Sequence, residues 1–100
     1  MNKIEELKKW SNPEIAQKQA EKYLGKDVEL FISEKKDKKY DIYDPNNNKW
    51  VSFGQIGFQD FTKHKNLERR KRYLNRATNM RGNWKDNPYS ANNLSINILW

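Results

Sequence analysis

The sequence predicts an α+β fold with N-terminal helices, a small three-stranded antiparallel sheet, a basic helix after the sheet and an apolar C-terminal segment. Apolar residues recur at helical spacing before Gly25, alternate with polar residues after it, and return to helical spacing from Phe58 onward. A chain of 100 residues holds one modest core, so we expect a single domain. Its three regions are a helical N-terminal region (1–25), an antiparallel meander (26–57) and a basic helix with a C-terminal clamp (58–100).

The N-terminal region is predicted to hold one substantial helix. Asn12 followed by Pro13 is typical of an N-cap and a first helical position, and Gly25 stands where a helix commonly ends. We therefore expect a helix over Pro13–Leu24. The preceding segment, Asn2–Trp10, has helical spacing but is short enough to be marginal alone.

Three strands are predicted to follow. Alternation over Val28–Ser33 indicates a half-buried strand, and the charged run Glu34–Lys39 indicates a polar turn. A second strand begins at Tyr40 and is expected to end at the turn Asp44–Asn48, where proline and asparagines favour tight geometry. The third strand is expected over Lys49–Phe53, which completes an antiparallel meander.

Two glycines mark the end of this meander. Gly54 and Gly57 lie three apart in the run FGQIGF, where we predict a turn or bulge that lets the chain leave the sheet. A phosphate-cradling loop is the weaker alternative, because the lysine and hydroxyl of a Walker loop are missing. Beyond it, Asp60 is expected to cap a short turn and Asn66 a longer helix, Leu67 to about Asn79.

The positive charge of the chain is concentrated in this second helical region. The formal net charge is +7, and the segment from Lys63 to Lys85 alone carries +8, which leaves −1 for the rest. Such asymmetry is typical of a nucleic-acid-binding surface, ahead of an anionic membrane surface, whereas a solvated helix face normally mixes signs. The candidate nucleic-acid-binding residues are Lys63, Lys65, Arg69, Arg70, Lys71, Arg72, Arg76, Arg81 and Lys85.

On the basic helix, one side is expected to be apolar and to carry Leu67, Arg70, Tyr73, Leu74 and Ala77. The chain then ends in an apolar stripe over residues 94–100. A helix capped by Asn92 or Asn93 is favoured there, although the alternation of the stripe also suits a strand. The stripe is expected to pack on the core; the alternative is a docking surface for a partner.

An enzymatic alternative depends on Asp60 and His64, which lie four residues apart and would meet on one helical face. A structural Asp-Thr-His cap at a strand-to-helix junction is the favoured interpretation. The chain has no cysteine, which excludes disulfides and thiolate metal sites, and we expect no cofactor. The charged N-terminus and the lack of a long apolar run predict a protein that is neither secreted nor inserted in a membrane.

From Lys38 to Trp100 the chain carries the ordered motifs FGQxG, DFTKHK, RRxxYLxR, GNWKDNPY and a final LW. This set resembles a family of small basic proteins encoded by large nucleocytoplasmic DNA viruses of algae and protists. The resemblance implies a viral protein located in the virion or in the interior of an infected host cell, cytoplasm or nucleus. It implies no reaction and no binding residues.

We therefore hypothesise a non-enzymatic viral protein that binds nucleic acid through phosphate contacts, with little sequence specificity and with DNA ranked ahead of RNA. If about five side chains neutralise phosphates, log K should fall against log salt with a slope of about −4 to −5. The alternative is a minor capsid or other virion structural protein whose basic helix docks on acidic protein surfaces, with exposed Trp10, Trp50 and Trp100 as hot spots of the interface. A homo-oligomer is compatible with either. The third alternative is a phosphodiester-cleaving enzyme that uses Asp60 and His64.

Overall fold

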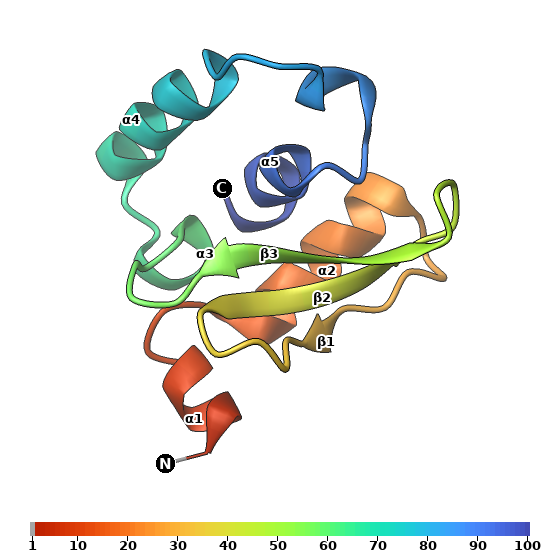
Figure 1. Cartoon of the computed structure of the whole chain (residues 1–100). Helices are drawn as coiled ribbons and strands as arrows, with labels where there is room; N and C mark the ends of the chain where they lie inside the picture. Colours follow the sequence, from red (N-terminus) through yellow and green to blue (C-terminus); the bar gives the residue numbers. More distant parts are fainter. Residues whose placement is uncertain (1) are drawn as a thin grey trace.

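The computed structural model describes residues 2–100 and confirms the α+β fold, with a three-stranded antiparallel sheet in the order β1-β2-β3 (Figure 1). Helix α2 covers one face of the sheet, and the end of the chain returns beneath the arch formed by α4 and the following loop (Figure 1). In chain order the elements are α1 (Lys3–Leu7), α2 (Pro13–Leu24), β1 (Phe31–Ile32), β2 (Lys38–Asp44), β3 (Lys49–Gln55), α3 (Phe61–His64), α4 (Leu67–Thr78), the 3-10 helix η1 (Trp84–Asp86), α5 (Ala91–Leu94) and the π-helical η2 (Ser95–Leu99).

Helix α2 has the predicted bounds, and its caps explain them. The Asn12 side chain accepts from the backbone N–H groups of Glu14 and Ile15, and Pro13 occupies the first turn. The helix ends at Gly25, whose φ of +116° lies where residues with a Cβ are rarely found. Local sequence alone therefore fixes both ends of this helix.

The first strand is much shorter than Val28–Ser33, because α2 takes hydrogen bonds that a sheet partner would have made. The Gln17 side chain donates to the Val28 carbonyl (2.9 Å) and accepts from the Leu30 N–H (2.9 Å). Only Phe31 and Ile32 then pair with β2. The predicted strand is thus correct in place and wrong in length.

The other two strands are longer than predicted. Strand β2 begins at Lys38 rather than Tyr40, and β3 continues to Gln55, so Lys38 pairs with Gln55 at the far end of the hairpin. The turn between them is confirmed: Asp44 Oδ1 accepts from the backbone N–H groups of Asn46 and Asn47. The assignment of Lys38 and Lys39 to a polar turn is corrected.

Gly54 lies inside β3, and the predicted departure from the sheet comes later, at Gly57. Its φ is +80°, and a Cβ placed there would lie 3.0 Å from both Leu99 and Lys39. Gly57 also has a positive φ, +105°, but open space around it. The first glycine therefore permits close packing, and the second makes the turn.

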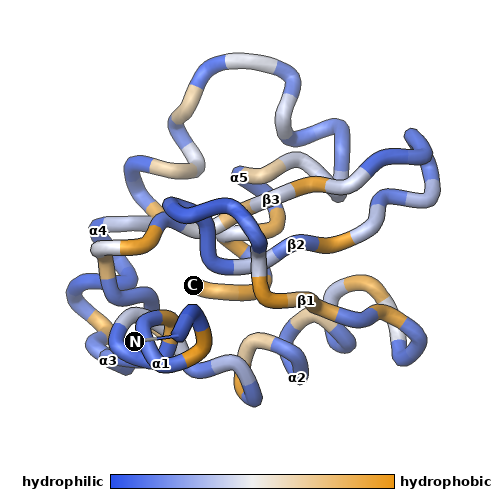
Figure 2. The backbone as a smooth tube through the Cα atoms, turned by 60° about the horizontal axis from the view of Figure 1, so that its bottom comes forward, coloured by the Kyte–Doolittle hydropathy of each residue, from blue (hydrophilic) through white to orange (hydrophobic). Residues whose placement is uncertain are grey.

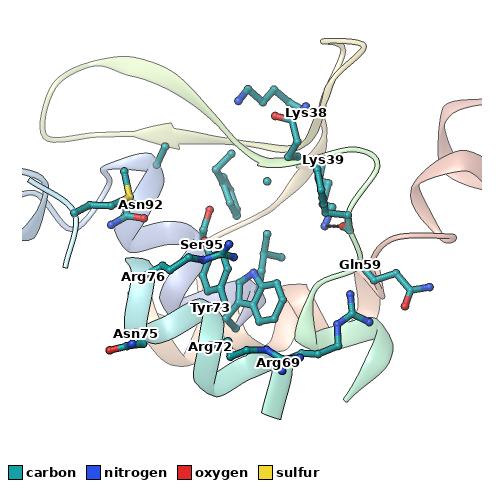
Figure 3. A pocket seen from close by; sticks show the side chains of 18 residues that line it. Lys38, Lys39, Gln59, Arg69, Arg72, Tyr73, Asn75, Arg76, Asn92 and Ser95 are labelled. Carbon is teal, nitrogen blue, oxygen red and sulfur yellow. Dashed lines mark hydrogen bonds between the residues drawn. The ribbon is translucent and has the colours of Figure 1, made fainter. Parts of the chain in front are cut away.

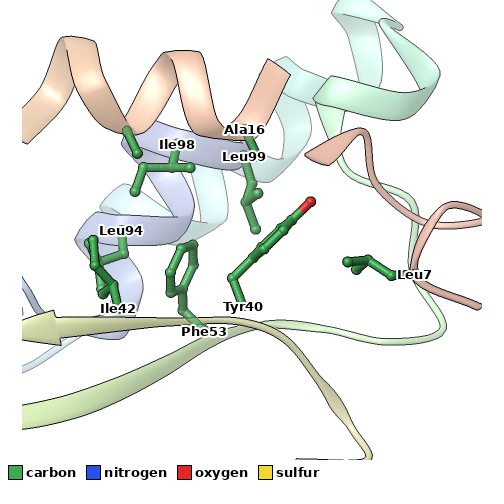
Figure 4. Close-up of a cluster of buried hydrophobic side chains, with 9 residues drawn as sticks. Leu7, Ala16, Tyr40, Ile42, Phe53, Leu94, Ile98 and Leu99 are labelled. Carbon is green, nitrogen blue, oxygen red and sulfur yellow. The ribbon is translucent and has the colours of Figure 1, made fainter. Parts of the chain in front are cut away.

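The C-terminal stripe is helical and belongs to the core, as favoured. Leu94, Ile98 and Leu99 are fully buried with residues of α2 and of β2 and β3 (Figure 4). The tube near the end marked C is coloured as hydrophobic where it enters the interior (Figure 2). The docking-surface alternative for this segment is therefore wrong.

The predicted cap of the C-terminal helix is corrected. Ser90 caps α5, its hydroxyl accepting from the Asn93 N–H. The Asn92 side chain instead donates to the Ala77 carbonyl (3.0 Å) and that of Asn93 to the Trp84 carbonyl (2.9 Å). Both asparagines thus hold α5 to neighbouring segments. Such tertiary hydrogen bonds leave no local pattern.

Helix α4 begins at Leu67, as predicted, with Asn66 as its cap, and ends at Thr78, one residue before the predicted end. On its expected apolar side Ala77 is buried and Tyr73 and Leu74 are half-buried, but Leu67 is 71% exposed. The Ala77 carbonyl accepts from the Asn92 side chain of α5, and the Tyr73 ring stacks on Trp100 at the end of the chain. Leu67 lies in the first turn, before these contacts, which explains why that part of the prediction is wrong.

Candidate nucleic-acid interface

A groove of about 870 Å³ opens between the ends of β2 and β3 on one side and α4 and α5 on the other (Figure 3). All the charged side chains that line it are basic, and polar amides and aromatic rings complete the lining. The lining includes Lys38, Lys39, Gly54, Arg69, Arg72, Tyr73, Arg76 and Trp100. A concave basic surface of this kind attracts anions.

Three arginines of α4 form one wall of the groove. The Asn66 side chain accepts from the Arg69 N–H (3.1 Å) and so fixes where the helix begins. Arg69, Arg72 and Arg76 then recur at intervals of three and four residues, which places them on one face. Figure 3 shows them along α4, with Lys38 and Lys39 across the groove. Guanidinium groups in such a row suit successive phosphates.

These arginines have no carboxylate partners in the described chain. Across residues 2–100, the single salt bridge joins Lys39 to Asp60. All three arginines are exposed. Their charge is therefore available to a ligand and is not neutralised by the fold.

The opposite wall holds Lys38, which sequence reasoning missed. Because β2 starts two residues earlier than predicted, Lys38 pairs with Gln55 and reaches the groove. Its own carbonyl accepts from Lys3 Nζ (2.8 Å), which holds the start of the strand. A longer strand assignment would have revealed it, but the run of charges before Tyr40 resembles a turn.

Lys39 also borders the groove, but its ammonium group is already bonded to other residues of the protein. Its Nζ donates to Asp60 Oδ2 (3.0 Å) and to the Phe58 carbonyl (2.7 Å), and the side chain is buried. Burial lowers the pKa of Lys39, although the Asp60 carboxylate opposes that shift. The lysine therefore fixes the loop after β3 and adds little free charge to the groove.

A chain of buried hydroxyl groups extends from this ion pair. The Asp60 carboxylate accepts from the N–H and the hydroxyl of Thr62, and thus caps α3. The Thr62 hydroxyl lies 3.1 Å from that of Ser11, which lies 2.7 Å from the Tyr40 hydroxyl. Burial raises the pKa of Tyr40. The network ties β2, the start of α2 and α3 together, and so positions the chain that leads into α4.

Two stacked aromatic rings form part of the groove surface next to the arginines. The Tyr73 and Trp100 rings are nearly parallel, with centroids 4.1 Å apart. The centroid of the His64 ring lies 5.1 Å from that of the Trp100 ring. Burial raises the pKa of Tyr73, so its hydroxyl is neutral near pH 7. The rings hold α4 to the end of the chain.

Arg70 was predicted to bind nucleic acid, but its side chain contacts other parts of the fold instead. Its Nε donates to the Trp100 main-chain oxygen (2.6 Å), and its guanidinium lies 5.5 Å from the centroid of the Phe61 ring. It borders a second cavity of about 520 Å³ rather than the groove. Arg70 therefore joins α3 and α4 to the C-terminal segment.

The structure brings three of the nine predicted binding residues together in the groove. These are Arg69, Arg72 and Arg76. The remaining candidates other than Arg70 are exposed elsewhere, on the connection before α4, on other faces of it or after it: Lys63, Lys65, Lys71, Arg81 and Lys85. Lys85 lies over the Trp84 ring at 5.5 Å. The positive segment thus has one concave part and several scattered positions.

The predicted Asp-Thr-His cap is half correct. Asp60 and Thr62 form it, whereas His64 Nδ1 accepts from the Asn66 N–H (2.9 Å) and does not bond to the carboxylate. In the described residues His64 Nε2 is buried without a hydrogen-bond partner. Burial lowers the pKa of His64, and the positive charge of Arg69 lowers it further. Asp60 therefore does not orient this imidazole.

The three tryptophans expected to be exposed differ in their surroundings. Trp50 is 57% exposed, as predicted. Trp10 and Trp100 are partly buried, so their expected exposure is corrected: Trp100 stacks on Tyr73, and the Trp10 carbonyl accepts from the Asp60 N–H. Only Trp50 among them presents most of its ring to solvent.

Over the described residues 2–100, no three histidine, aspartate or glutamate side chains gather closely enough to hold a metal ion. Within the same range, no helix combines the length and the apolar character that crossing a bilayer requires.

The model of a family of unknown function, DUF5754, matches residues 28–77. The chain belongs to this family. The match spans the meander and continues to Ala77 in α4, so it includes Lys38, Arg69, Arg72 and Arg76 of the groove. No curated protein and no solved structure matches the chain. Membership in DUF5754 assigns no activity to these residues.

Proposed function

We propose that this DUF5754 protein binds nucleic acid without catalysis, through phosphate contacts in the basic groove and with little sequence specificity. One observation carries the proposal: Arg69, Arg72 and Arg76 line one wall of a groove whose charged lining is entirely basic. Lys38 from the opposite wall adds a fourth cation. Charge on both sides of a concave surface favours a polyanion that lies within it.

The lining also favours low sequence specificity. Arginine forks recognise phosphate oxygens wherever they occur along a backbone, whereas base recognition needs donors and acceptors held at base edges. With about four phosphates neutralised, log K should fall against log salt with a slope of about −3 for a single strand and about −4 for a duplex. The slope is shallower than the one expected for five contacts, because the groove offers Arg69, Arg72, Arg76 and Lys38, whereas Arg70 donates to the Trp100 main-chain oxygen.

A non-enzymatic role accords with the surroundings of Asp60 and His64. The carboxylate is held by Lys39 and Thr62, and the histidine makes its hydrogen bond to the Asn66 N–H. A general base needs a free lone pair directed at substrate and a partner that orients it. On the resemblance to proteins of large DNA viruses, we propose that the protein is associated with the virion and that DNA ranks ahead of RNA.

The test compares two triple variants by fluorescence anisotropy with random-sequence DNA at several salt concentrations. The groove variant is Arg69→Glu, Arg72→Glu and Arg76→Glu. The matched control, Lys63→Glu, Lys71→Glu and Arg81→Glu, makes the same change in net charge at exposed positions outside the groove. We expect the groove variant to lose at least a hundredfold in affinity at low salt and the control to lose severalfold.

Two results would contradict the proposal. Equal losses in both triple variants would show that net charge, and not the groove, governs binding. Absence of binding by the folded wild-type protein at low salt would remove nucleic acid as the partner. The groove would then be assigned to an acidic protein surface, as in the minor capsid alternative.

A further inference from the structure

Three aromatic side chains form an exposed cluster on the outer face of the sheet. Phe31, Tyr43 and Trp50 are 43%, 41% and 57% exposed. The Trp50 ring centroid lies 5.4 Å from that of Phe31 and 5.5 Å from that of Tyr43, both edge to face. Each strand of the sheet contributes one member. Large exposed apolar groups gathered in this way indicate a surface that meets a partner.

The register of the sheet explains why the cluster faces away from the core. Tyr43 pairs with Trp50 across β2 and β3, and side chains alternate between the two faces of a strand. Tyr40, Ile42 and Phe53 point to the covered face, where α2 and the C-terminal helix bury them. The cluster therefore stands on the face that those helices leave open.

The geometry of the rings suits unstacked nucleobases. All three rings remain at least 41% exposed, and every base, whatever the sequence, has a π-face that stacks on an exposed aromatic ring. The bases of a duplex are already stacked on each other and cannot reach the cluster without unpairing. A single strand presents its bases freely.

The cluster and the groove lie toward opposite ends of β3. Trp50 and Ser52 occupy alternate positions on the open face, whereas Gly54, two residues further on, has a positive φ, lies against Leu99 and lines the groove. Four residues of strand span about 13 Å. Between the two ends, the Asp41 carboxylate accepts from the Ser52 hydroxyl (2.6 Å). A carboxylate there repels phosphates and accepts hydrogen bonds from base amino groups, which favours a strand with its bases toward the sheet.

From these observations we infer that the nucleic acid is single-stranded and lies along β3, with bases stacked on Phe31, Tyr43 and Trp50 and phosphates in the groove. The inference rests on the proposed function of the groove. It adds a second contact surface and a reason for the protein to prefer single strands.

The test measures Trp50→Ala with three probes of equal length: a random single strand, a random duplex and an abasic single strand. We expect the variant to bind the single strand about tenfold or more weakly and the duplex within twofold of wild type. Wild-type protein should bind the abasic strand about as weakly as the variant binds the normal one. Trp50→Phe should retain most of the affinity, because it keeps an aromatic ring.

Leu67→Ala is the matched control, since Leu67 is also exposed and apolar but lies away from the sheet face. An unchanged single-strand affinity in Trp50→Ala, or an equal loss with the duplex, would overturn the inference while leaving the groove variants to support the proposed function. The inference would also be overturned if Trp50→Ala altered self-association and not nucleic-acid affinity, because the cluster would then be a contact between protein molecules. If wild-type protein binds none of the probes, both proposals fail.

Discussion

The ammonium of Lys39 lies 3.0 Å from the carboxylate of Asp60, and both side chains are almost completely buried beside the basic groove. The pair joins β2 to the residue that caps α3. Isolated charges at this depth would be strongly destabilising, so each requires the other. The groove thus stands on an ion pair that contributes to folding and not to ligand binding.

Removal of one partner of this pair should be costly. We expect Asp60→Ala to lower the free energy of unfolding by about 3–5 kcal/mol, because it leaves the Lys39 charge buried and also removes the cap of α3. Urea denaturation followed by circular dichroism measures the change. The exposed Asp37→Ala is the control and should stay within about 0.5 kcal/mol of wild type. A loss below about 1 kcal/mol at Asp60 would contradict the burial of the pair.

Gly54 should tolerate substitution less well than Gly57. Both have a positive φ, but a Cβ at Gly54 would lie 3.0 Å from Leu99 and Lys39, whereas one at Gly57 would meet nothing within 4 Å. Gly54→Ala should therefore cost about 1–3 kcal/mol beyond the backbone strain of about 1 kcal/mol that both variants share. Thermal unfolding of the two variants provides the comparison. Equal destabilisation would mean that packing against Leu99 does not constrain β3.

His64 should make stability depend on pH. Burial lowers its pKa in the folded protein below the ordinary value of 6.5, so the unfolded chain binds more protons as pH falls through that value. The contribution of His64 to stability is thus complete above pH 6.5 and is lost progressively below it. His64→Gln should flatten this part of the profile.

The chain has a single histidine, so its NMR titration can be assigned without ambiguity. We expect a midpoint below that of a model peptide. A midpoint at or above 6.5 would contradict the burial of the imidazole. Urea denaturation of wild type and His64→Gln between pH 5 and 8 would test the stability effect independently.

Arg70 and Arg72 should separate stability from binding. Arg70→Met removes the hydrogen bond to the Trp100 oxygen and the contact with the Phe61 ring, and should cost about 1–3 kcal/mol of stability with little change in nucleic-acid affinity. Arg72→Met should weaken nucleic-acid binding with little change in stability, because the Arg72 side chain is exposed and lines the groove. Denaturation and anisotropy on both variants measure the two effects. Similar losses of affinity would restore Arg70 to the binding surface.

Much of the local structure could be predicted because its causes lie within a few residues. Asn12, Asp60 and Asn66 cap the helices that they were expected to cap, and the turn at Asp44 forms as its composition indicates. The concentration of positive charge near α4 is likewise a property of the sequence. What could not be predicted was which of those charges share a surface.

The amino-acid sequence by itself determined the α+β class, the bounds of α2 and the start of α4, because capping and periodicity act locally. The tertiary structure alone decided that Arg69, Arg72 and Arg76 face Lys38 across a groove while Arg70 turns to Trp100. It also decided that Lys39 forms its ion pair with Asp60, 21 residues away in the sequence. The physical reason is that side chains distant along the chain compete for the same space and hydrogen-bond partners, and only packing resolves that competition.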